Sequence, residues 1–324
     1  MKVGILGTGA IAHTLADTMR QMPEIEMEAC ASRTKEYAET FANEYGIKKA
    51  YGSYEEMAAD DSLDLVYVAT PHSRHFEDMK LLIEHGRNVL CEKSFTINQK
   101  EAETIQQLAS EKNVYVAEAI WTRYMPSRQI INDAISDGTI GKVYVLTANL
   151  SYAMETKKRI MDPELAGGAL LDVGVYGLNF VAMHFGLGDI DHIDSSVSMT
   201  KTGVDGNEAI AIHYKYGRMA VLTHGVFGRS DRHGIFYGEK GYIVVDNIND
   251  PTSVQAFDDN DKLIKVYTIP DQISGYEYEL REAAQLISEG KKESTSMPMS
   301  ETIRMMGVMD TLRAQWGMVY PKEK

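Results

Sequence analysis

Cysteine is scarce in this 324-residue sequence, which contains only Cys30 and Cys91. Both lie inside or at the end of apolar runs, and their spacing matches neither a metal site nor a disulfide framework. We therefore expect two small buried side chains, no metal-binding site and a cytoplasmic protein.

Basic residues are also few, since 33 lysines and arginines stand against 47 aspartates and glutamates, a formal net charge of -14. Nucleic-acid affinity depends on basic side chains that neutralise phosphates, so this charge argues against DNA or RNA as a partner. Hydrophobic runs of transmembrane length are missing too, and glycines interrupt the apolar N-terminal stretch MKVGILGTGAIA. We expect neither a membrane anchor nor a signal peptide.

What is present in residues 1–120 is an alternation of β-rich runs with helical patterns. The expected strands are KVGILG, EMEACAS, LDLVYVAT, NVLCEK and VYVAEA, and the expected helices cover 10–22, 35–45, 73–86 and 98–112. This order predicts a doubly wound α/β domain of parallel strands joined by crossover helices.

From residue 142 the pattern changes to longer strand candidates separated by turn signals. They are KVYVLTANLSYA, EAIAIHYKY, RMAVLTHGVF, GIFYGEKGYIVVDN, TSVQAF and KLIKVYTI, followed by two helices near 277–289 and 300–315. Such a series predicts an α+β domain with an open, mostly antiparallel sheet. We therefore expect domains over 1–120 and 121–324, with the last helix able to pack back on the first domain.

The sequence GTGAIA directly after the first strand forms a G-x-G-x-x-A pattern with Gly7, Gly9 and Ala12. Gly7 would permit the tight turn, Gly9 a close approach to a pyrophosphate, and Ala10 and Ile11 would begin the helix that faces it. Within a βαβ unit this predicts a dinucleotide-binding Rossmann domain. The alternative is a glycine turn with only a steric purpose.

Cofactor choice is set at the end of the second strand, where NAD-binding proteins place a carboxylate. Here the sequence reads ASRTK, and Arg33 can pair with a 2′-phosphate while Ser32 and Thr34 offer hydroxyl groups. NADP is therefore favoured, and NAD stays possible. The alternative is that Arg33 is a solvated loop residue.

Two further strand ends, ATPHSRH and CEKSF, should lie at the carboxyl edge of the parallel sheet, where ligands bind. We expect cofactor contacts from both, with Lys93 able to act on a nearby hydroxyl group. Lys93 could instead be a surface lysine paired with an acidic neighbour, and loop histidines are common for structural reasons. The expected cofactor contacts here are Thr70, Pro71, His72, His75, Glu92 and Lys93.

With these motifs and AGGALLDVGVY at 166–176, the sequence resembles the Gfo/Idh/MocA family of NAD(P)-dependent oxidoreductases. EAIWTRYMP at 118–126 is most similar to its dimeric dihydrodiol dehydrogenase and D-xylose dehydrogenase branch, which implies that Trp121 and Arg123 lie near the nicotinamide. An interface tryptophan beside an ion pair would explain them equally well. Ser94 departs from the usual proline, which predicts a less rigid loop after Lys93.

The resemblance implies that Tyr176 is the general acid/base, that Lys93 is its electrostatic partner and that Asp172 orients the substrate. Many family members have histidine at the position of Tyr176, so an imidazole mechanism does not transfer. Residues four apart in a helix share a face, so Asp172 and Tyr176 could point together. Gly174 and Gly177 would let a ligand or backbone come close, and Arg159 could reach a substrate oxygen or belong to a basic surface cluster.

These observations together predict an NADP-preferring oxidoreductase that acts on a secondary alcohol and ketone or hemiacetal pair in a sugar, polyol or vicinal diol. Two alternatives remain at this stage: a non-catalytic NADP-binding regulator, and a glycosidase that uses a tightly bound nicotinamide as a transient oxidant. We also expect a homodimer or larger assembly, because an antiparallel sheet with helices on one face leaves the other face to be covered.

Overall fold

The computed structural model describes residues 1–324 and consists of two compact units. Unit 1 comprises residues 1–124 and 272–306, and unit 2 comprises residues 125–271 and 307–324. Helix α9 (Glu277–Ser288), which we had assigned to the second domain, thus belongs to unit 1. The reason is apolar burial, because Leu280, Ala283 and Leu286 join the hydrophobic core around the first strands.

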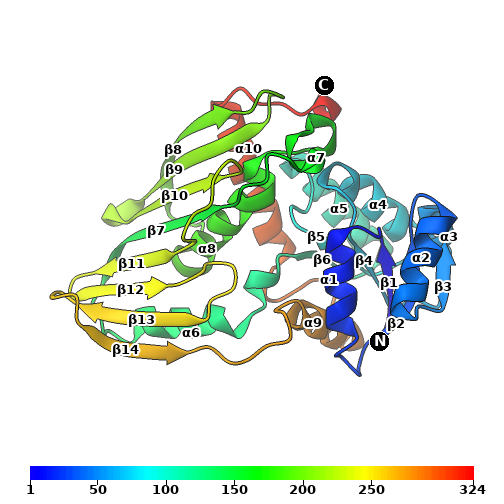
Figure 1. Cartoon of the computed structure of the whole chain (residues 1–324), viewed down its shortest axis with the longest axis horizontal. Coiled ribbons are helices and arrows are strands. Elements are labelled where there is room, and N and C mark those ends of the chain that lie inside the picture. The colour runs from blue at the N-terminus through cyan, green and yellow to red at the C-terminus, as the bar shows by residue number, and fades with distance from the viewer. The chain divides into compact units, whose positions relative to one another are not determined.

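Unit 1 contains a six-stranded sheet in the order β3-β2-β1-β4-β5-β6, in which every neighbouring pair is parallel (Figure 1). This is the doubly wound order of a dinucleotide-binding fold, as the sequence predicted. The strands are β1 (Lys2–Leu6), β2 (Glu26–Ala31), β3 (Lys49–Tyr51), β4 (Leu65–Val68), β5 (Val89–Glu92) and β6 (Val116–Ala119).

The helices of unit 1 begin at side-chain caps where the sequence offers them. Thr34, Ser53 and Asn98 each accept a hydrogen bond from a main-chain N–H in the first turn of α2, α3 and α5. The sequence analysis missed β3 and α3 because both are too short to show a period. The helices are α1 (Ala10–Met19), α2 (Lys35–Tyr45), α3 (Tyr54–Ala58), α4 (His72–Glu84) and α5 (Gln99–Lys112), with a short turn η1 (Trp121–Arg123) after β6.

Unit 2 contains an eight-stranded sheet in the order β14-β13-β12-β11-β7-β10-β9-β8. All neighbouring pairs are antiparallel except β10 and β7, so the expected mostly antiparallel sheet is confirmed but it is not a simple meander. The strands are β7 (Val143–Ser151), β8 (Ile190–Met199), β9 (Asp205–Tyr214), β10 (Met219–Gly225), β11 (Gly234–Gly238), β12 (Gly241–Val245), β13 (Ser253–Asp258) and β14 (Leu263–Thr268).

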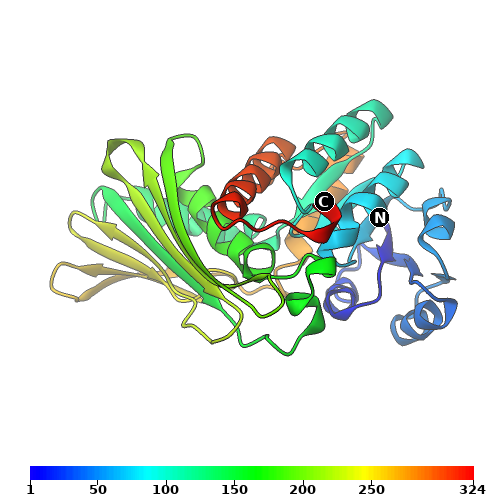
Figure 2. The ribbon, with the colours of Figure 1, turned by 90° about the horizontal axis from the view of Figure 1, so that it is seen from above.

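Helix α8 (Val175–Phe185) lies against one face of this sheet, where it contacts β7 and β10 (Figure 2, green). Helix α6 (Pro126–Ser136) contacts α8, and the short helix α7 (Lys158–Met161) follows β7 along the chain. At the edge strand β14, Leu263, Ile264 and Val266 are exposed. Whether a second copy of the chain covers such side chains stays a prediction. Helix α10 (Met299–Gln315) begins in unit 1 and ends in unit 2.

One helical stretch, Pro163–Phe185, is long and apolar enough to cross a membrane by length and composition, contrary to our expectation from the sequence. However, 94% of its 18-residue apolar window is buried inside the structure. This burial is what the central helix of a globular unit requires, because its apolar surface packs against the sheet rather than against lipid.

Candidate active site

The turn between β1 and α1 has the backbone geometry that a phosphate-binding loop requires. Gly7 has a φ of +99°, and a Cβ placed on it would lie 2.9 Å from the carbonyl oxygen of Ala69. Gly9, which precedes α1, is exposed, and a Cβ there would meet no atom within 4 Å. No side chain caps α1, so its first N–H groups are available to a phosphate next to Gly9, Ala10 and Ile11.

The loop that follows β2 holds the residues predicted to select the cofactor. Ser32 is buried and its hydroxyl group lies 3.0 Å from that of Thr8 in the glycine turn, which connects the two loops. Arg33 is exposed and no carboxylate stands at this strand end. Thr34 caps α2, because its side-chain oxygen accepts a hydrogen bond from Tyr37 N. This oxygen therefore stabilises the start of the helix.

At the end of β4, His75 joins two loops rather than facing solvent. The ring is fully buried, with Nδ1 2.8 Å from the carbonyl oxygen of Ser94 and Nε2 2.8 Å from that of Thr70. Burial lowers the pKa of the His75 imidazole, so the neutral ring donates through one nitrogen at a time. His75 therefore positions both strand ends, and a direct cofactor contact by it stays a prediction.

Other residues between the end of β4 and the second turn of α4 are also connected to one another. The Thr70 hydroxyl donates to Asp78 Oδ2 at 2.8 Å, and Arg74 Nη2 donates to Asp78 Oδ1 at 2.6 Å. Pro71 is exposed, and the buried His72 ring meets the His75 ring edge to face at 5.8 Å. Thr70, Pro71 and His72 thus lie at the predicted edge of the sheet.

Lys93 follows β5 and is partly exposed, which suits a group that acts on a ligand. The Lys93–Ser94 peptide bond is cis. We had expected a less rigid loop because Ser94 replaces a proline, but Ser94 is fully buried and its carbonyl oxygen contacts His75. A lower rigidity of this loop stays a prediction.

The Glu92 side chain is buried within unit 1 rather than exposed at the surface. Its Oε1 lies 2.7 Å from the Tyr67 hydroxyl group, and its Oε2 accepts a hydrogen bond from Lys93 N at 3.2 Å. The Tyr67 hydroxyl group also lies 2.9 Å from Glu279 Oε1. Burial, together with the charge of Glu92, raises the pKa of Glu279 well above its usual range.

Helix α9 therefore supplies residues near this strand end that the sequence analysis missed. Besides Glu279, Tyr276 stacks on Trp121 with ring centroids 4.9 Å apart and planes 11° apart. The buried Arg123 forms an ion pair with Glu301, at 3.7 Å. These contacts fit the structural explanation for the WTR sequence, and a nicotinamide contact by Trp121 or Arg123 stays a prediction.

In unit 2, Asp172 and Arg159 form a two-pronged ion pair. Arg159 Nη1 donates to Asp172 Oδ1 at 2.6 Å and Nη2 to Oδ2 at 3.3 Å. Asp172 is buried while the Arg159 side chain is about half exposed. Both residues were predicted to contact substrate, and the structure pairs them with each other, so Arg159 is not simply part of a basic surface cluster.

Asp172 and the buried Tyr176 do not lie in one regular α-helix as we had expected. Residues Leu170–Gly174 form a π-helical turn with wider i→i+5 hydrogen bonding, and α8 begins only at Val175. Such turns are rare and are often found at functional sites. The assumption of α-helical spacing between Asp172 and Tyr176 was therefore wrong.

The glycines around this turn make room for side chains of the sheet, not for a ligand or backbone. A Cβ on Gly168 would lie 2.1 Å from Asp205 Oδ1, one on Gly174 would lie 2.2 Å from Glu208 Oε1, and one on Gly177 would lie 1.9 Å from His224 Nε2. Our interpretation of Gly174 and Gly177 is thus corrected. Each glycine lets the helix approach a buried polar group on β9 or β10.

These three polar residues of the sheet lie next to the π-helical turn that carries Asp172 and the start of α8 that carries Tyr176. Glu208 and His224 are opposite each other on β9 and β10, and His224 Nδ1 lies 2.7 Å from Glu208 Oε1. Asp205 Oδ2 accepts a hydrogen bond from Leu170 N at 2.5 Å. Burial, together with the charge of Glu208, raises the pKa of Asp205 to about 7.

Comparison with known proteins agrees with both units. Residues 1–119 match the model of an oxidoreductase family with an NAD-binding Rossmann fold, and residues 129–244 match that of the GFO/IDH/MocA C-terminal domain. The chain belongs to the Gfo/Idh/MocA family of oxidoreductases. It is therefore an NAD(P)-dependent oxidoreductase with an NAD(P)-binding Rossmann domain.

Curated relatives of this Gfo/Idh/MocA protein match over its full length. Trans-1,2-dihydrobenzene-1,2-diol dehydrogenase of Xenopus laevis is 32% identical, over 99% of each chain. The enzymes of that name from Danio rerio and Homo sapiens are 31% and 29% identical, over 100% of this chain and 99% of theirs.

Solved structures resemble its fold. One is a 3-ketoreductase from Actinomadura kijaniata in complex with NADP and TDP-benzene, with 22% identity, 97% of each chain covered and a TM-score of 0.89. Another is an aldose-aldose oxidoreductase from Caulobacter crescentus complexed with glycerol, with 18% identity, 99% of each chain covered and a TM-score of 0.87.

The close approach of Gly177 to His224 can be tested in this Gfo/Idh/MocA protein by adding a methyl group to the glycine. Gly177→Ala should lower the free energy of unfolding by about 1–3 kcal/mol or more, because the new methyl group overlaps the imidazole. Chemical denaturation measures this loss.

Gly188→Ala is the matched control, because a Cβ there meets no atom within 4 Å, and it should change stability by less than about 0.5 kcal/mol. His224→Ala in the Gly177→Ala background should recover part of the loss relative to the sum of the single changes. Equal stability of the Gly177→Ala protein and the wild type would refute the contact.

The raised pKa of Asp205 predicts a pH dependence of stability. The folded state holds the Asp205 proton up to about pH 7, whereas its usual pKa is 3.8, so this contribution is present at low pH and is lost as the pH rises through about 7. The Asp205→Asn protein lacks this titration. Relative to that variant, the wild type should lose on the order of 1 kcal/mol or more between pH 4 and 8.

Urea unfolding of both proteins across this pH range measures the difference. Other titrating groups, such as His75, are common to both proteins and cancel in the comparison. A difference in unfolding free energy that stays constant from pH 4 to 8 would show that Asp205 titrates normally.

Proposed function

We propose that the protein is an NADP-preferring dehydrogenase or reductase that interconverts a secondary alcohol and a ketone or hemiacetal in a vicinal diol, sugar or polyol. The observation that carries this proposal is its full-length similarity, at about 30% identity, to enzymes named as dihydrodiol dehydrogenases. The fold neighbours named as sugar oxidoreductases or ketoreductases are consistent with the broader substrate class.

The residues of unit 1 fit the dinucleotide. The open space at Gly9 and the uncapped start of α1 suit a pyrophosphate, and the solved neighbour with NADP supports the choice of that cofactor. Arg33 would pair with the 2′-phosphate, and Ser32 next to it in the same loop would donate to that group. When bound, the nicotinamide supplies the carbon that accepts or donates hydride.

The remaining task for the protein is to move a proton and to orient the substrate. We propose that the Tyr176 hydroxyl exchanges this proton with the substrate oxygen. A tyrosine hydroxyl group is protonated at neutral pH, and the positive charge of Lys93 would favour its ionised form. Asp172, held by Arg159, would accept a hydrogen bond from a second substrate hydroxyl group, which is a reason to favour diols.

A screen of vicinal diols, sugars and polyols with NADP and NAD, followed by absorbance of the reduced cofactor, tests the function. Turnover of a diol or sugar with NADP supports the proposal. Failure of every secondary alcohol, and of the corresponding ketones with reduced cofactor, would contradict it and leave a non-catalytic dinucleotide-binding protein.

Tyr176→Phe removes one hydroxyl group and keeps the ring. Folding and NADP affinity should survive, while kcat falls by about 10²–10⁴-fold, the usual effect of losing a general acid or base. Steady-state kinetics on a substrate found in the screen measure the loss. Turnover within about threefold of the wild type would move the proton transfer to another residue, with Asp172 as the next candidate.

Lys93→Met should cause a similar loss and shift the alkaline limb of the pH–rate profile upward, because the charge that favours the ionised tyrosine is gone. The double variant with Tyr176→Phe should be little worse than either single variant, because Lys93 acts through Tyr176. Fully multiplicative losses would contradict this coupling.

Arg33→Asp should raise the Kd for NADP by about tenfold or more and leave NAD binding unchanged or improved, because it removes the partner of the 2′-phosphate and adds a carboxylate. Fluorescence titration with both cofactors measures it. Lys80→Glu on the exposed face of α4 makes the same change in net charge and should affect neither cofactor. Equal changes in the Kd for NADP in the two variants would show that Arg33 acts only through its long-range charge and does not contact the 2′-phosphate.

A further inference from the structure

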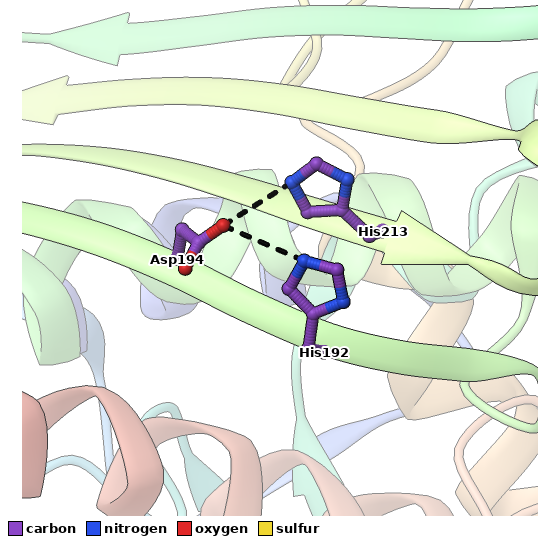
Figure 3. A group of neighbouring side chains, drawn as sticks. All are labelled: His192, Asp194 and His213. Carbon is purple, nitrogen blue, oxygen red and sulfur yellow. Dashed lines mark ion pairs between the residues drawn. The ribbon is translucent and has the colours of Figure 1, made fainter.

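Three side chains with metal-binding atoms lie close together on the edge strand β8 of the unit 2 sheet and on its neighbour β9. His192 of β8 lies directly opposite His213 of β9 in the antiparallel register, and Asp194 follows His192 by two residues. Side chains two residues apart in a strand share a face, so all three project to the same side (Figure 3). All three are at least partly exposed to solvent.

The distances among the three groups match the coordination sphere of a small metal ion. Asp194 Oδ2 lies 3.5 Å from His192 Nε2 and 3.4 Å from His213 Nε2, and the three ligand atoms lie within 4.8 Å of one another. Two ligands bound at about 2.1 Å to one tetrahedral ion are separated by about 3.4 Å. The atoms thus surround a position that one ion can occupy with little movement.

Hydrogen bonding and charge also favour a cation here. Asp191 Oδ2 lies 2.9 Å from His192 Nδ1, so a neutral ring that donates there presents an unprotonated Nε2 to Asp194. A carboxylate that holds the second nitrogen of a ligating histidine is common in metal sites. The two imidazole rings are stacked, with centroids 4.2 Å and planes 8° apart, and neither aspartate has an ion pair with lysine or arginine.

We propose that His192, Asp194 and His213 bind one first-row divalent transition-metal ion, with Zn²⁺ as the representative. Two imidazole nitrogens and one carboxylate oxygen suit zinc, whereas Mg²⁺ and Ca²⁺ prefer oxygen ligands alone. Three protein ligands leave a fourth position to water. The ion would join the edge strand β8 to β9 and is separate from the residues proposed for the oxidoreductase reaction.

The test uses the full-length protein with any histidine-containing affinity tag removed, because a tag would bind zinc itself. Zinc is titrated calorimetrically and in competition with a coloured chelator at a fixed pH of about 7.5, because metal affinity depends on pH. The wild type should bind one equivalent, and saturation should raise its thermal unfolding temperature. Co²⁺ should give the visible absorption of a tetrahedral site containing nitrogen ligands.

His213→Phe keeps a ring in the stack and removes both nitrogens, so zinc affinity should fall at least about tenfold while the zinc-free protein stays folded. Asp194→Asn should weaken binding in the same direction. His233→Phe is the matched control, because His233 is another partly exposed histidine with a carboxylate nearby, since its Nδ1 lies 3.5 Å from Asp231 Oδ2. It should leave the zinc affinity unchanged.

Two results would overturn the site. One is that the wild type shows no saturable binding of one equivalent at about 0.1 mM zinc. A site with three protein ligands should have a Kd for zinc below that concentration. The other is equal zinc affinity of the His213→Phe protein and the wild type, which would place the ion elsewhere on the chain.

Discussion

The close approach of three glycines to buried polar side chains determines how the helical stretch with Asp172 and Tyr176 lies on the unit 2 sheet. Gly168, Gly174 and Gly177 have no Cβ, so the π-helical turn and α8 can lie against Asp205, Glu208 and His224 of the sheet. Burial of a polar group lowers stability unless the group is hydrogen-bonded. Glu208 and His224 pair with each other and Asp205 accepts a hydrogen bond from the main chain, while one polar atom of each side chain has no hydrogen-bond partner. The position of Tyr176 and Asp172 follows from this contact.

Unit 1 depends on a related arrangement at the carboxyl ends of its parallel strands. His75 connects the loops after β4 and β5, and Tyr67 connects Glu92 to Glu279 of α9. Lys93 is thereby attached to a buried framework while its own side chain stays partly exposed. In both units, residues assigned to the proposed reaction are supported by buried polar groups to which that proposal gives no step.

The sequence predicted the features that have a local backbone requirement. The glycine turn around Gly7, the parallel sheet and most strand positions were identified because turns and strands leave short-range patterns. The π-helical turn was missed because its apolar pattern looks α-helical, and the role of α9 was missed because it returns to unit 1 from residue 272. Strand β8 was missed because it is a polar edge strand. The cluster of His192, Asp194 and His213 was missed with it, because these residues come together only through the pairing register of β8 and β9.

In the proposed function, a hydride passes directly between the carbinol carbon of a diol or sugar and the nicotinamide of NADP. The most direct measurement uses a vicinal diol deuterated at its carbinol carbons and mass spectrometry of the cofactor after turnover. The account predicts that each reduced NADP molecule gains one deuterium from the substrate. Reduced cofactor without deuterium, or no reduction with any deuterated diol or sugar, would contradict it.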